Sequence, residues 1–125
     1  MTEVLGYINA QMEEIGIPYE FMMWTAKVTY PYFVGEYSET DPVTEDGLEE
    51  KTFIVTGTTR NSWAELMEVQ EKIKKHFNPI TGKTAILESG SGIAVFYSTS
   101  FPVPTGEEEL KRLQINLNVK LWKVE

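Results

Sequence analysis

The sequence predicts an α+β domain in which two helices pack on one face of a mainly antiparallel sheet, in the order α-β-β-(β)-α-β-β-β. Apolar residues recur at helical spacing in two segments, residues 2–15 and 62–77. Strict alternation of apolar and polar residues marks a strand at residues 113–123, and aromatic and β-branched runs mark the others. Because the strands are grouped rather than alternating regularly with helices, an α+β arrangement is favoured over a parallel sheet.

Length and composition are those of one globular domain. The chain has 125 residues, of which 42% are hydrophobic and 24% charged, enough for one hydrophobic core and too few for two. We therefore expect one domain, residues 1–125, with an acidic loop at about residues 36–50 inserted between strands. Neither a signal-peptide pattern nor an apolar run of membrane-spanning length is found, so the sequence predicts a cytosolic protein without a membrane partner.

Charge and residue content argue against several functions. A formal net charge of −8 repels a phosphate backbone, so sequence-specific binding of nucleic acid is not expected. The absence of cysteine excludes a disulfide framework, a thiolate metal site and a cysteine nucleophile. The one histidine, His76, falls in the last turn of the second helix, where the helix dipole favours its protonated form. No serine stands in a nucleophile-elbow pattern, so we expect no enzyme, no metal and no cofactor.

The first part of the chain predicts a helix followed by two or three strands. Apolar residues at positions 4, 5, 8, 12 and 15 describe an amphipathic helix that ends at Gly16. Aromatic and β-branched residues from Tyr19 onward predict a strand that ends near Tyr30, before Pro31. Residues 32–37 and 51–60 predict two further strands.

The second part of the chain predicts a helix and three strands. Ser62 and Glu65 fit a capping box that begins the helix, and Asn78-Pro79 ends it after a basic last turn. Residues 89–92, Ser-Gly-Ser-Gly, predict a tight turn between two paired strands. A final strand follows at residues 113–123.

The final strand supplies the first candidate interface. At about 3.3 Å per residue it would span roughly 36 Å, which equals or exceeds the width of a domain with a radius of gyration of about 14 Å. Its ends therefore either overhang and pair with a neighbouring subunit, or a bulge or coiling shortens the strand. Trp122, in the polar phase, is either exposed, covered by a helix, or an anchor against a partner. The candidate interface residues in this phase are Asn116, Asn118, Lys120 and Trp122.

Two further candidate surfaces precede the second helix. Tyr32 and Tyr37 belong to an aromatic group expected in the core or at a subunit interface, because the surrounding negative charge opposes base stacking. An acidic stretch is the candidate channel or docking loop, although a solvated loop and a divalent-cation site also remain open. The spacing of an EF-hand fails, because Val43 and Asp46 occupy a ligand position and the glycine position. The acidic residues are Glu36, Glu39, Asp41, Glu45, Asp46, Glu49 and Glu50.

Several stretches resemble proteins encoded in the tail-assembly modules of prophages from Gram-positive bacteria. These stretches are residues 57–63 (GTTRNSW), 90–97 (GSGIAVFY), 102–106 (PVPTG) and 110–115 (LKRLQI). The order of elements is similar to that of tail-terminator, or tail-completion, proteins. The resemblance implies a non-enzymatic subunit of a hexameric ring that caps the tail tube and joins it to the head connector.

The resemblance also implies partners and a location. The partners would be further copies of the chain, the tail tube protein and a head connector or neck protein. The protein would act in the bacterial host cytoplasm during assembly and then reside in the virion tail or neck. The acidic loop could line a channel through which DNA slides.

Two other classes of function remain open from the sequence. One is a small monomeric adaptor or regulatory domain that binds one host or phage protein through the acidic loop. The other is an enzyme that uses carboxylates, which would require a walled pocket holding two carboxylates with divergent pKa values.

Overall fold

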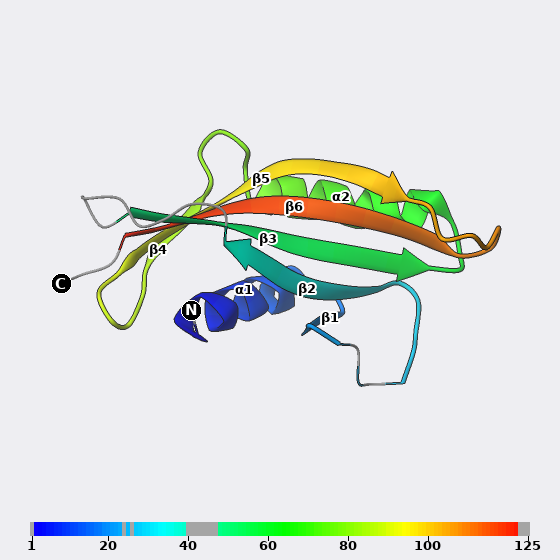
Figure 1. Ribbon diagram of the computed structural model, residues 1–125, viewed down its shortest axis with the longest axis horizontal. Coiled ribbons are helices and arrows are strands. Elements are labelled where there is room, and N and C mark those ends of the chain that lie inside the picture. Colours follow the sequence, from blue (N-terminus) through cyan, green and yellow to red (C-terminus); the bar gives the residue numbers. More distant parts are fainter. Residues whose placement is uncertain (1, 24, 26, 40–47, 123–125) are drawn as a thin grey trace.

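The computed structural model describes residues 2–23, 25, 27–39 and 48–122, with the backbone alone at residues 2 and 39. These residues form two helices and six strands (Figure 1). The elements are α1 (Thr2–Glu14), β1 (Tyr19–Phe21), β2 (Tyr32–Glu39), β3 (Leu48–Thr59), α2 (Trp63–His76), β4 (Lys83–Ile86), β5 (Gly92–Val103) and β6 (Lys111–Trp122). The predicted α+β class and the predicted order of elements are confirmed.

The strands form one sheet in the order β1-β2-β3-β6-β5-β4. β1 pairs with β2 in parallel, and the other neighbouring strands pair in antiparallel fashion. β3 and β6 lie at the centre and pair along their whole length, from Leu48 opposite Trp122 to Thr59 opposite Lys111. The sheet is therefore mainly antiparallel, as predicted.

α1 and α2 pack on the same face of this sheet. In Figure 1, α2 runs behind β5 and β6, and α1 lies next to β1. Alternate residues of β3 and β6 point to this face, and they join the buried side chains of the helices in one hydrophobic cluster, whose burial is the main favourable term in folding. The cluster includes Val4, Ile8, Met12, Phe33, Phe53, Val55, Leu66, Ile73, Phe77, Val95, Leu113, Ile115, Leu117, Val119 and Leu121.

Local sequence explains how the helices begin and end. Gly16, just past α1, has a φ of +74°, a left-handed conformation that glycine adopts without steric cost. Ser62 is the N-cap of α2, and its Oγ accepts a hydrogen bond of 3.3 Å from the backbone N–H of Glu65. The Glu65 carboxylate accepts a hydrogen bond from the Thr59 hydroxyl at 3.4 Å, so the cap is also joined to the end of β3.

The first predicted strand is much shorter than expected. β1 ends at Phe21, and the prediction of a strand reaching Tyr30 is wrong. Met22 has a φ of +68°, which turns the chain out of the sheet directly after its N–H donates to the Gly35 carbonyl at 2.7 Å. The Glu20 carboxylate then accepts hydrogen bonds from the backbone N–H and the hydroxyl of Thr25, at 3.1 and 2.6 Å. These contacts favour a turn over continued pairing.

The long final strand does not overhang the sheet. β6 is flanked by β3 on one side and by β5 on the other, with Trp122 opposite both Leu48 and Gly92. The alternative in which the ends of β6 pair with a neighbouring subunit is therefore wrong, because both of its edges are occupied. β5 follows β6 with a bulge between Tyr97 and Thr99.

Candidate protein interface

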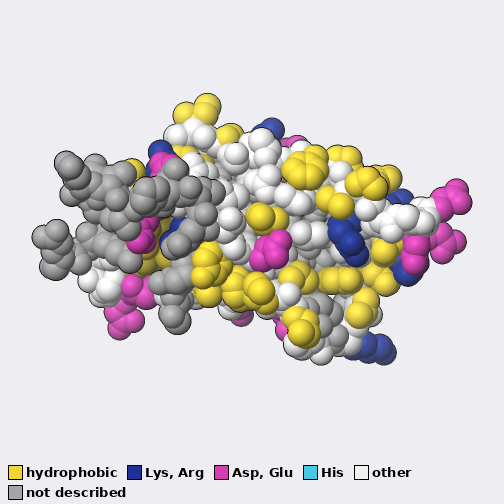
Figure 2. Space-filling model, in the orientation of Figure 1, with side chains coloured by type: hydrophobic (Ala, Val, Ile, Leu, Met, Phe, Trp, Pro, Cys, Tyr) yellow, Lys and Arg dark blue, Asp and Glu magenta, His cyan; other side chains and the backbone are white. Residues whose placement is uncertain are grey.

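The face of the sheet opposite the helices is called the open face here, because no helix or strand of the described residues packs on it (Figure 2). Register places side chains from four strands on it. Antiparallel sheets commonly have one face on the core and one toward solvent. The side chains are Tyr32, Val34, Glu36 and Ser38 of β2, Glu50, Thr52, Ile54, Thr56 and Thr58 of β3, Phe96, Thr99 and Phe101 of β5, and Arg112, Gln114, Asn116, Asn118, Lys120 and Trp122 of β6.

Hydrogen bonds hold the polar side chains of the open face in position. The Gln114 amide nitrogen donates to Asn116 Oδ1 at 3.2 Å, and the Asn116 amide nitrogen donates to Thr99 Oγ1 at 3.0 Å. Arg112 Nε donates to Thr58 Oγ1 at 3.4 Å. Since these bonds connect β3, β6 and β5, the open face presents polar groups whose directions are set before any partner arrives.

The end of β6 combines a cation with aromatic rings. Lys120 Nζ lies 3.8 Å from Glu50 Oε1 and 5.6 Å from the centre of the Phe96 ring. Both charged side chains are about one-third exposed, so this ion pair stabilises the fold by less than about 1 kcal/mol. Trp122 is 41% exposed, and its indole lies beside Gly92 of β5. This end of the open face thus has an aromatic group and a cation available for contact.

Most of the interface residues predicted on the strands are brought together. Asn116, Asn118, Lys120 and Trp122 follow one another along the open face of β6, and Tyr32 lies on the same face of β2. Tyr37 does not belong to this group. It has the phase of Phe33, faces the helix side, and stacks on the Phe21 ring at a centroid distance of 6.3 Å.

The acidic stretch is not one continuous loop between residues 36 and 50. Residues 36–39 belong to β2 and residues 48–50 to β3, so the predicted boundaries are wrong at both ends. Glu36 and Glu50 lie on the open face, and Glu39 lies opposite Lys51 in the register. Asp41, Glu45 and Asp46 lie outside the described residues.

Glu49 is placed in an unexpected position. Its side chain points to the helix side of β3 and is 9% exposed, and Lys51, on the same side of the strand, is 5% exposed. Every second residue of β3 faces the helices, so Glu49 and Lys51 share the side of Phe53 and Val55. They are covered there because β6 pairs opposite them with Leu121 and Val119. An inward charge at the end of a strand has no signature in the hydrophobic pattern.

His76 does not have the raised pKa that the helix dipole would favour. Burial lowers its pKa, the positive charge of Lys83 lowers it further, and Glu14 opposes both effects. The ring Nε2 lies 2.7 Å from Gln11 Oε1, and the ring packs edge-on against Phe77. The expectation of a favoured protonated form is therefore wrong, because neither the burial of the ring nor the position of Lys83 beside it could be read from the sequence.

Among residues 2–23, 25, 27–39 and 48–122, no group of three or more Asp, Glu, His or Cys side chains could hold a metal ion. The described helices include none that is long and apolar enough to cross a membrane.

Comparison with protein-family models and with curated protein sequences gives no match for this chain.

Proposed function

We propose that the protein is a non-enzymatic structural subunit of a siphophage tail, which forms a hexameric ring that closes the tail tube and joins it to the head connector. The resemblance of four sequence stretches to tail-assembly proteins supports the phage context. The observation that carries the proposal is the open face, a broad sheet surface with oriented polar groups and partly exposed aromatic rings.

The chemistry of the open face suits contact with another protein. Trp122 and Phe101 are 41% and 45% exposed, and aromatic residues and arginine are enriched where protein interfaces derive most of their binding energy. The amides of Asn116 and Asn118 lie between these rings along β6, and Arg112 lies one position beyond Phe101. A partner covering this face would bury the rings and bond to polar groups that are already oriented.

A second part of the proposal concerns the carboxylates of the open face. Glu36 and Glu50 share this face with the cations Arg112 and Lys120, so the support for a negatively charged channel wall is the net charge of −8 of the whole chain. A negatively charged channel wall repels DNA, so DNA could slide past the ring without binding to it. Changing Glu36 and Glu50 to Gln should slow DNA passage through assembled particles while tail joining continues. Unchanged DNA passage would contradict the channel-lining role.

The function is tested by measuring mass with light scattering over a concentration series, with and without polymerised tail tube from the same phage. We expect a ring, or binding that depends on the tube. Trp122→Ala should weaken self-association or tube binding by about tenfold or more. Val28→Ala, a control at an exposed apolar residue outside the strands, should have little effect. A monomer that ignores the tube would contradict the proposal and favour a monomeric adaptor.

A further inference from the structure

β5 has an outer edge that is paired over part of its length. β4 pairs with residues 92–95, and the backbone N–H of Tyr97 donates to the Phe77 carbonyl at 2.8 Å. From residue 98 to residue 103, the described residues supply no backbone partner to this edge. Residues 98–101 of this edge are a template for pairing with another strand, whereas Pro102 has no N–H to donate.

β2 has a similar edge on the other side of the sheet. β1 pairs with Phe33, Val34 and Gly35, and the Met22 N–H completes this pairing at the Gly35 carbonyl. Residues 36–38 then have no backbone partner on the outer side within the described part of the chain. The free segments of β2 and β5 thus lie on opposite edges of the sheet.

The two free edges differ in charge. Residues 98–103 of β5, Ser-Thr-Ser-Phe-Pro-Val, carry no ionisable side chain. The free segment of β2 begins with Glu36 and is followed by Glu39. Two β2 edges placed together would bring like charges across a strand pair, which is unfavourable. The neutral β5 edge is the better partner for β2.

Exposed apolar side chains lie beside the β5 edge. Phe101 is 45% exposed on the open face, and Trp63 and Met67 of α2 are each 40% exposed. The Gln70 amide nitrogen donates to the Tyr97 hydroxyl at 2.8 Å and to Ser100 Oγ at 3.2 Å, which fixes α2 alongside this half of β5. Trp63 and Met67 lie on the same side of α2 as Gln70 by their helical spacing.

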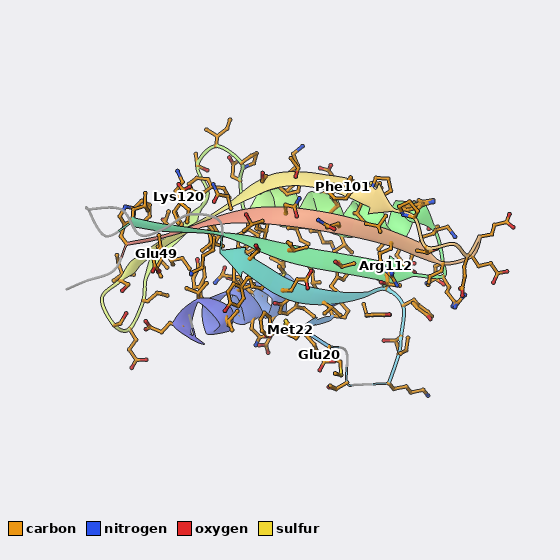
Figure 3. All side chains as sticks on the ribbon, in the orientation of Figure 1. Glu20, Met22, Glu49, Phe101, Arg112 and Lys120 are labelled. Atoms are coloured by element: carbon orange, nitrogen blue, oxygen red, sulfur yellow. The ribbon has the colours of Figure 1, made fainter. Side chains whose placement is uncertain are left out.

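The β2 edge also has apolar neighbours. Met22 and Met23 are 63% and 67% exposed, and they directly follow β1 at the point where the free segment of β2 begins. In Figure 3, Met22 and Phe101 lie toward opposite edges of the sheet. A strand docked on residues 36–38 would therefore meet the two methionines at one end, so both free edges offer a backbone ladder with apolar side chains next to it.

We propose that the free edge of β5 in one copy pairs with the free edge of β2 in the next copy, with the open faces on the same side. This inference rests on the proposed ring. β2 runs parallel to β6 and β5 runs antiparallel to it, so equally oriented copies bring β5 and β2 together in antiparallel fashion. Two different edges make a head-to-tail contact, which closes into a ring when the rotation between copies allows it.

The positions of the free segments also predict a stagger between copies. Residues 98–103 lie at the end of the sheet where Val103, Arg112 and Thr58 are neighbours, whereas Ser38 lies nearer the other end, opposite Thr52. Adjacent copies must therefore shift along the strand direction before the free segments meet. A shift of this kind tilts strands relative to the axis of a closed sheet.

Disulfide cross-linking tests the pairing, since the natural chain contains no cysteine. Ser38→Cys protein mixed with Thr99→Cys protein, in the presence of tail tube, should give a cross-linked dimer, because both side chains are on the open face. Ser100→Cys in place of Thr99→Cys is the matched control. The side chain of residue 100 points to the helix side, so the Ser100→Cys protein should cross-link with a yield at least about tenfold lower.

Three cross-linking outcomes would overturn the edge pairing. Thr99→Cys protein cross-linking efficiently to itself would show a two-fold β5–β5 contact instead. Equal yields from Thr99→Cys and Ser100→Cys would show that the open faces of neighbouring copies do not lie on the same side. A lack of cross-linking while light scattering shows assembly would refute edge pairing and leave the tail function intact. If the protein neither self-associates nor binds the tube, both proposals are wrong.

A charge exchange provides an independent test. Phe101→Glu places a carboxylate on the β5 edge, where it would face the acidic β2 edge, and should reduce assembly by about tenfold or more. Phe101→Gln introduces a side chain of the same shape as glutamate but without the charge, so this variant should lose less assembly. Adding Glu36→Lys to Phe101→Glu should restore assembly, with unchanged circular dichroism showing that all variants are folded. Full assembly of the Phe101→Glu protein would overturn the edge pairing.

Discussion

The two faces of β6 present opposite chemistry on one backbone. Toward the helices, Leu113, Ile115, Leu117, Val119 and Leu121 are at most 4% exposed. Toward the open face, amides, an arginine, a lysine and Trp122 remain in partial contact with solvent. Because successive side chains of a strand point to opposite sides, one strand can stabilise the fold and also present a recognition surface. Substitutions on the first face should change stability, and those on the second should change assembly.

Leu117→Ala should have the largest effect on folding. Leu117 is fully buried between neighbouring strands and the helices, so truncation leaves a cavity and lowers the free energy of unfolding by about 2–5 kcal/mol. Asn118→Ala, one residue later on the open face, should change it by less than about 0.5 kcal/mol. Urea denaturation of both variants measures the difference. Equal losses would mean that the two faces of β6 are not distinct.

Gly57→Ala should have the next largest effect. The Phe33 ring from β2 crosses Gly57, and an added methyl group would overlap with it, so the free energy of unfolding should fall by about 1–3 kcal/mol. Gly6→Ala in α1 is the control with the opposite sign. No atom lies within 4 Å of the added group there, so the better helix propensity of alanine should stabilise the protein by up to about 1 kcal/mol. A tolerated Gly57→Ala variant would show that this part of the helix-side core is loose.

His76 should give the smallest effect, seen as a pH dependence. Its folded pKa is lowered, mainly by burial and then by Lys83, so the unfolded chain binds the proton first as the pH falls. Stability should therefore be complete above the unfolded pKa of about 6.5 and decrease as the pH falls from there to the folded pKa. His76→Gln should have a flatter dependence between pH 7.5 and 5. Identical slopes for both proteins would contradict the assigned environment.

Features determined by local sequence could be predicted well. The alternation of β6, the N-cap at Ser62 and the turn near Gly90 depend on neighbouring residues, and each is present in the fold. The length of β1 could not be predicted, because the left-handed turn at Met22 overrides the β-propensity of the residues that follow. The hydrophobic pattern also could not predict which strands pair with each other. The strand period shows which side chains share a face, but not that β3 and β5 occupy both edges of β6.

The candidate interface was predictable for the same reason and to the same extent. Asn116 to Trp122 were found from the polar phase of one strand, which the register preserves. Tyr37 lies on the helix side, which agrees with the core alternative, because the burial of Phe33 four residues earlier sets the phase of β2. The free edges of β2 and β5 depend on where the short strands β1 and β4 stop, which only the three-dimensional arrangement shows.

Hydrogen–deuterium exchange of the free protein and of the protein assembled with tail tube tests the division between the two faces most directly. We predict new protection of amides in residues 36–38 and 98–101, with exchange in α1 and α2 unchanged. Protection that appears in the helices while both strand edges exchange as before would contradict this account, because the assembly contacts would then lie on the other side of the sheet.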